Sequence, residues 1–98
     1  MTHSVSLDDD VKQTIAGWRL SEHVHRELFR GFDELGRSPS RLLVRVGPPD
    51  DSLQYDLAIS DPGPPGRDYL FVFSILYSVD EESLSVVKAD YISSDHVG

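Results

Sequence analysis

The sequence predicts an α+β domain in which two N-terminal helices pack on an antiparallel β-meander of three to four strands. Apolar side chains recur at helical spacing in residues 8–36 and at every second position in segments after residue 40. Prolines and glycines divide the second half into lengths typical of strands. The chain has 98 residues, 39% of them hydrophobic, and no cysteine. We therefore expect a single domain, residues 1–98, held by core packing without disulfides.

The first helix is expected to follow a short strand in residues 1–7. Asp8 is a candidate N-cap, because its carboxylate can accept hydrogen bonds from the first turn. Side chains at i, i+4 and i+7 share one face of a helix. The apolar residues at this spacing are Val11, Ile15 and Trp18. Gly17 indicates that this helix is short.

The second helix is expected to begin after Ser21, another N-cap candidate. Its buried stripe is predicted at apolar positions three or four residues apart: Val24, Leu28, Phe32 and Leu35. Phe29 is expected to widen the stripe, and Gly31 to weaken the helix by about 1 kcal/mol relative to Ala. Gly36 is expected to end the helix in the left-handed conformation. Ser38-Pro39-Ser40 is not expected to continue it.

The second half of the chain has four features of a meander. Residues 41–46 read as a strand, and residues 53–60 alternate so that one face should be dry and the other wet. Residues 69–79 are apolar on both faces, which is typical of a central strand. Residues 80–83 form a hairpin connection, and residues 84–92 are the return strand, with a polar mixture typical of an edge.

The central strand predicts an interaction surface. Two short helices can cover only one face of the sheet, so the face that carries Leu70, Val72 and Leu76 is expected to be a partly exposed apolar strip. Natural monomers seldom expose such a strip without using it, which predicts a homodimer or a protein partner. The alternative is that the N-terminal strand, the proline-rich loop or the C-terminal tail covers the strip.

The arginines form a second candidate surface. The net charge is −8, yet residues 19–45 contain six arginines, whereas residues 46–98 contain two basic residues and ten carboxylates. The spacing of 7, 4 and 7 residues places three of four arginines on one face of the second helix: Arg19, Arg26, Arg30 and Arg37. This stripe could dock an acidic partner or RNA. The alternative is a solvated face paired with nearby carboxylates.

No segment contains a self-sufficient catalytic, cofactor or metal motif. His23 and His25 point in different directions on a helix, so they are not expected to bind one metal ion together. No serine lies in a Gly-x-Ser-x-Gly turn, and the prolines of residues 62–66 remove donors that a phosphate loop needs. Residues 1–10 are polar and lack the apolar segment of a signal peptide, so we expect a cytoplasmic protein without a membrane partner. The acidic residues 46–98 are a poor surface for phosphate backbones, so we do not expect a nucleic-acid partner.

Two segments resemble the RelE/ParE-like toxin superfamily of bacterial toxin–antitoxin systems. They are residues 32–39, Phe-Asp-Glu-Leu-Gly-Arg-Ser-Pro, and the hairpin of residues 73–82. The resemblance implies the fold above and a site for mRNA cleavage. The family commonly has basic residues where this chain has Ser74 and Asp90, and cleavage of RNA by side chains needs cations to stabilise developing negative charge.

The resemblance therefore implies a non-catalytic, protein-binding relative of these toxins without ribonuclease activity. Two alternatives stay open. One is an active mRNA-cleaving toxin whose basic residues have moved to residues 19–45. The other is an acidic inhibitor or immunity-type protein that binds a basic partner through its carboxylates.

Overall fold

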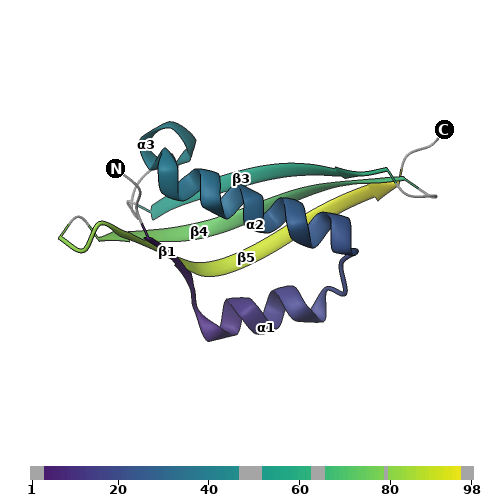
Figure 1. Cartoon of the computed structure of the whole chain (residues 1–98), viewed down its shortest axis with the longest axis horizontal. Coiled ribbons are helices and arrows are strands. Elements are labelled where there is room, and N and C mark those ends of the chain that lie inside the picture. Colours follow the sequence, from purple (N-terminus) through teal and green to yellow (C-terminus); the bar gives the residue numbers. More distant parts are fainter. Residues whose placement is uncertain (1–3, 47–51, 63–65, 79, 96–98) are drawn as a thin grey trace.

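The computed structural model describes residues 4–46, 52–62, 66–78 and 80–95, which form helices on one side of a five-stranded mixed sheet (Figure 1). The elements are β1 (Ser4–Leu7), α1 (Asp9–Gly17), α2 (Glu22–Arg37), α3 (Pro39–Leu42), β2 (Val44–Val46), β3 (Ser52–Asp61), β4 (Arg67–Ser78) and β5 (Ser83–Asp95). The strand order is β1-β5-β4-β3-β2, and every neighbouring pair is antiparallel except β1 with β5. The predicted α+β class, with N-terminal helices followed by strands, is confirmed.

Helix α2 lies across the sheet and supplies much of the core. It begins where Ser21 accepts a hydrogen bond from the backbone N–H of Val24, over 3.3 Å. The whole predicted stripe is buried: Val24, Leu28, Phe32 and Leu35. The ring of Phe32 meets that of Phe73 edge-on, with centroids 4.9 Å apart. The stripe therefore packs on the odd-numbered side chains of the central strand, as predicted.

Phe29 does not widen this stripe, and the prediction that it would is wrong. Its side chain is 56% exposed. Successive residues of a helix are about 100° apart, so Phe29 is turned well away from the line of Leu28 and Phe32 that faces the sheet. It contacts its own helix instead, stacking with His25 and meeting Phe32 edge-on.

Helix α1 adds the second part of the same core. Val11 and Ile15 are buried beneath it, as their spacing predicts. Trp18 follows the last turn and packs on Phe71 and Tyr91, with ring centroids 5.7 and 4.7 Å away. Because β4 and β5 present the same face to Trp18 and to α2, both helices cover one side of the sheet (Figure 1).

The segment after α2 differs from the prediction. Gly36 is buried inside the last turn and has no positive φ, so it is not a left-handed stop; the helix continues to Arg37. Pro39 then opens the one-turn helix α3, because a proline at the first helical position gives up no hydrogen bond. The predicted strand at residues 41–46 is consequently shortened to β2. The connection at residues 47–51 lies outside the described residues.

Strand β5 is an edge strand only in part. It pairs with β4 along its length, and in parallel with β1 from Ser4 with Ser83 to Leu7 with Val86. The prediction of an edge is therefore wrong for residues 83–86, whereas no described strand other than β4 pairs with residues 87–95, which include Lys88 and Asp90. The strand also continues past the predicted end, to Asp95.

A β-bulge at Val87 sets which side chains of β5 reach the core. Ser74 pairs with Lys88, but the next residue, Ile75, pairs with Val86, so Val87 is left over. The bulge shifts the alternation by one residue, and core-facing residues have even numbers before it and odd numbers after it. These residues are Leu84, Val86, Ala89 and Tyr91.

Gly31 allows α2 to approach β3 closely. A Cβ atom at this position would lie 2.5 Å from Cδ2 of Leu57 and 3.0 Å from the hydroxyl of Tyr55. That hydroxyl donates a buried hydrogen bond to the carbonyl of Gly31, over 3.1 Å. The glycine that lowers helix propensity is therefore required by the contact between helix and sheet.

Replacing Phe32 with Ala should lower the free energy of unfolding by roughly 3–5 kcal/mol, because it removes a buried ring that packs on Phe73. Phe29→Ala makes the same chemical change at an exposed position and should cost less than about 1 kcal/mol. Urea unfolding measures both. Equal losses in the two variants would show that the helix presents a different face to the sheet.

Gly31→Ala should also destabilise the protein, by on the order of 1–3 kcal/mol, since its methyl group overlaps Leu57. Gly17→Ala is the matched control, because nothing lies within 4 Å of its Cβ position and alanine is the better helix former. Its stability should be unchanged or slightly higher in the same urea titration. A stabilised Gly31→Ala variant would rule out the close approach.

Candidate functional site

The side of the sheet opposite the helices, called the open face here, exposes apolar side chains. It carries the even-numbered residues of β3 and β4 and residues of β2 and β5 that pair with them. Exposed apolar side chains on this face are Val44 (54%), Leu70 (37%), Leu76 (61%) and Ile92 (68%). Val72 is half-buried. Alternation along β4 predicts Leu70, Val72 and Leu76 on this face, whereas Val44 and Ile92 lie on other strands and were not predicted.

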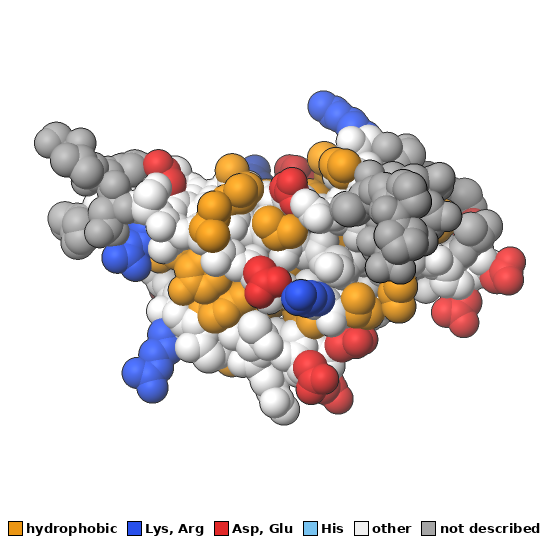
Figure 2. Space-filling view, turned by 180° about the vertical axis from the view of Figure 1, so that it is seen from behind, with side chains coloured by type: hydrophobic (Ala, Val, Ile, Leu, Met, Phe, Trp, Pro, Cys, Tyr) orange, Lys and Arg blue, Asp and Glu red, His pale blue; other side chains and the backbone are white. Residues whose placement is uncertain are grey.

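Three segments were considered as a possible cover for this face: the N-terminal strand, the proline-rich loop and the C-terminal tail. Strand β1 extends the sheet at its edge, beside β5, and does not lie over the open face. Most of the proline-rich loop and the end of the tail, residues 63–65 and 96–98, lie outside the described residues. Figure 2 shows hydrophobic side chains spread along the face, with acidic and basic side chains among them.

The register arranges the open face in rows that run across the strands. Four successive rows are Ala58, Leu70 and Ile92; Asp56, Val72 and Asp90; Val44, Gln54, Ser74 and Lys88; and Leu76 with Ser85. The first row is apolar throughout, and a shallow hollow of about 290 Å³ lies beside it. The two middle rows carry the charged side chains of the face, together with Val72 and Val44, and form a mostly polar band that separates the first row from Leu76.

Short polar contacts organise the band. Nζ of Lys88 lies 3.8 Å from Oδ2 of Asp90, and both side chains are about 70% exposed. On the other side of Val72, Nε2 of Gln54 donates to Oδ1 of Asp56 over 2.7 Å. Both signs of charge therefore occur side by side near the middle of an apolar surface.

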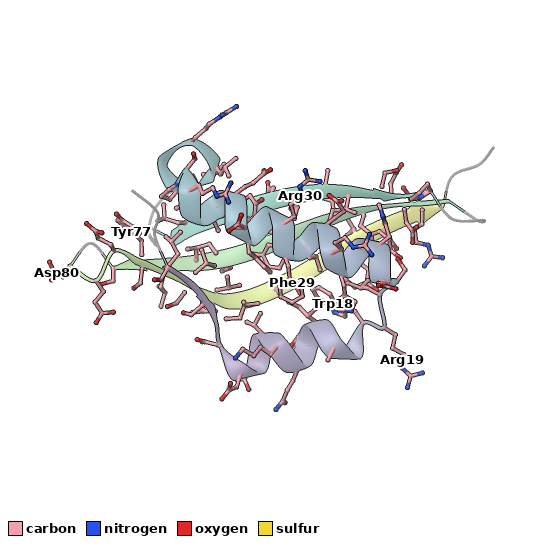
Figure 3. All side chains as sticks on the ribbon, in the orientation of Figure 1. Trp18, Arg19, Phe29, Arg30, Tyr77 and Asp80 are labelled. Carbon is pink, nitrogen blue, oxygen red and sulfur yellow. The ribbon has the colours of Figure 1, made fainter. Side chains whose placement is uncertain are left out.

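Three of the four arginines share one face of α2, as their spacing predicts, but each of the three is paired. Those on α2 each pair with a carboxylate of the same helix: Arg26 with Glu22 at 3.4 Å, Arg30 with Glu27 at 3.8 Å, and Arg37 with Asp33 at 3.0 Å. Arg19 lies in the connection between α1 and α2, in the left-handed region with φ 52°, and points away from α2 (Figure 3). The geometry thus favours a solvated, internally paired surface for α2.

A groove of about 480 Å³ separates α2 from the outer edge of β3. Strand β2 pairs only with residues 52–54, and no other described strand pairs with this edge. Nε2 of His23 lies 3.2 Å from the carbonyl oxygen of Ser60, and Glu27, Arg30 and Glu34 line the helix side. Within the described residues, no three His, Asp or Glu side chains come together in a way that could hold a metal ion.

The two positions expected to be basic in an RNA-cleaving site lie on the open face. Ser74 is next to Lys88 across the strands, and Asp90 is two residues further along β5. Lys88 brings one positive charge to these rows, which Asp90 offsets at 3.8 Å. This arrangement lacks the group of cations that holding and cleaving an RNA phosphate needs.

Comparisons with known proteins identify no family for this chain: no family model, no curated protein and no solved structure matches it. The resemblance to RelE/ParE-like toxins therefore stays a prediction. Across the described parts of the chain, none of the helices has the length and apolar character needed to cross a membrane.

The ionisation of Tyr55 makes the stability of the fold depend on pH. Its side chain is buried, and burial raises the pKa of its hydroxyl above the ordinary 10.0, with a further rise from the negative charge of Glu34. The unfolded chain releases this proton near pH 10, whereas the folded chain retains it. The contribution of Tyr55 to stability is therefore present below about pH 10 and is lost as the pH rises further.

Tyr55→Phe should lower the free energy of unfolding by about 1 kcal/mol at neutral pH, because the hydrogen bond to Gly31 is lost. Above about pH 10 the difference between the two proteins should shrink, since only the natural chain is destabilised by ionisation of this residue in the unfolded state. Urea unfolding of both proteins from neutral to strongly alkaline pH measures the difference. A difference that stays constant with pH would contradict the raised pKa.

Proposed function

We propose that this chain is a non-catalytic protein-binding domain that docks its partner on the open face of the sheet. The observation that carries the proposal is the exposure of large apolar side chains on the side that no described helix covers, above all Leu76 at 61% and Ile92 at 68%. Exposed apolar surface of this kind is typical of interaction sites. The lack of cysteine fits a reducing cytoplasm, where we propose that the domain works.

Covering these side chains would supply a moderate driving force. A few hundred Å² of apolar surface removed from water contributes several kcal/mol at about 25 cal/mol per Å². Loss of translational and rotational freedom offsets part of this gain. The surface therefore supports a specific contact of modest affinity.

The charges near the middle of the face support binding over catalysis. Asp56 and Asp90 flank Val72, and Lys88 is the neighbour of Asp90. Carboxylates at this place would repel the phosphates of RNA. Within this proposal the chain is a relative of RelE/ParE-like toxins in which the basic residues of the cleaving site are absent.

Site-specific crosslinking tests the proposal. A photoreactive benzophenone amino acid at position 76, which is exposed on the open face, should give crosslinked adducts with protein when the full chain is illuminated in cells. The same amino acid in place of Gln13, which is exposed on α1 on the far side of the molecule, is the matched control and should give few adducts. Adducts are resolved by gel electrophoresis and identified by mass spectrometry.

Three results would contradict the proposal. Equal yields at positions 76 and 13 would mean that the open face makes no specific contact. Adducts with RNA at position 76 would favour the mRNA-cleaving alternative. Growth arrest of a bacterial host on expression of the natural chain, abolished by Arg26→Ala or Arg30→Ala, would favour the same alternative with its site on α2.

A further inference from the structure

We infer that the protein docked on the open face is a second copy of this chain, related by a two-fold axis that runs across the strands between the Val72 row and the Ser74 row. The inference rests on the proposed function and names its partner. It follows from the order of the rows on the face and from the charges they carry.

A two-fold axis that lies between two facing sheets and runs across their strands sets each row against the row at the same distance on the other side of the axis. With the axis between the two middle rows, the Val72 row of one copy lies against the Ser74 row of the other. The apolar row with Leu70 then lies against the row with Leu76. Both contacts occur twice, so one surface serves both copies.

The charges favour this axis over a two-fold axis that runs along the strands. With the axis across the strands, Lys88 of each copy faces Asp90 of the other. The two copies then share two ion pairs close to the axis. An axis along the strands would instead exchange β3 for β5 within each row, because β4 lies between them. Asp90 would then face Asp56 of the other copy, and the two carboxylates would repel each other.

Both partners of the central ion pair can reorient. Lys88 and Asp90 are each about 70% exposed, and their 3.8 Å contact within one chain is a surface ion pair of little energetic value. The same side chains gain more between copies, where apolar rows on both sides exclude water. Leu70 and Leu76, exposed in the single chain, would cover each other.

The dimer is expected to be weak. Four strands at about 4.8 Å spacing and four rows at about 6.6 Å give a face on the order of 500 Å² per copy, below the about 800 Å² per partner of a standard interface. The net charge of −8 on each copy adds long-range repulsion. We expect association in the micromolar to high micromolar range.

Sedimentation equilibrium of the full chain and its charge variants tests the arrangement. Lys88→Asp places two carboxylates opposite each other, and Asp90→Lys places two ammonium groups opposite each other, so each should weaken self-association at least about tenfold. A mixture of the two variants should associate again, because every facing pair then has opposite signs. Lys12→Asp makes the same change of net charge as Lys88→Asp on the exposed surface of α1 and should leave the association unchanged.

Circular dichroism shows that each variant is folded, which is expected because positions 12, 88 and 90 are exposed. A chain that stays monomeric at every concentration overturns the inference, as does a dimer that Lys88→Asp does not weaken or a mixture that does not reassociate. If the chain alone is monomeric but position 76 crosslinks to a different protein, the inference fails and the proposed function stands. If position 76 gives no protein adducts, the proposed function fails as well.

Discussion

The packing of one face of α2 on the sheet is the contact on which the rest of the structure depends. It joins Phe32 to Phe73 in the core and brings the helix close enough for the hydroxyl of Tyr55 to reach the carbonyl of Gly31. Helix α1 extends the same layer through Trp18. Since α1 and α2 both lie on this side, no described helix or strand covers the opposite side of the sheet.

Much of this architecture could be predicted from local patterns. The buried stripe of α2 and the alternation of β3 appear directly in the order of apolar residues, because helix and strand have different periods. The end of α2 could not be predicted in the same way. Gly36 has the composition of a helix stop, but packing keeps it inside the last turn, and tertiary contacts override such local preferences.

The place of β5 in the sheet was predicted only in part. Its polar residues indicate an edge, which holds for residues 87–95 among the described strands but not for residues 83–86, where β1 pairs with it, and local composition does not reveal such a partner. The pairing with β1 joins residues that are about eighty positions apart, and no single segment encodes it. The order of strands therefore required the three-dimensional structure.

The candidate site was predictable in part for the same physical reasons. Leu70, Val72 and Leu76 follow from alternation along a single strand, which needs no knowledge of the neighbours. The position of Lys88 beside Ser74, and of Ile92 beside Leu70, depends on the register between β4 and β5. The arginines illustrate the opposite case: their regular spacing suggested a common role, but each one on α2 has a carboxylate of its own helix within 4 Å.

The bulge at Val87 lets the two halves of β5 direct opposite sets of numbers, even and odd, to the core. If Val87 took an ordinary place in the ladder, every side chain from Lys88 onward would change sides, so that Lys88, Asp90 and Ile92 would turn toward the helices. Loss of Val87 itself would have no such effect, because Val86 and Lys88 would then pair as consecutive residues with Ile75 and Ser74. In the descent of this protein, Val87 is therefore the position of β5 at which a residue can be gained or lost while the interior keeps its side chains.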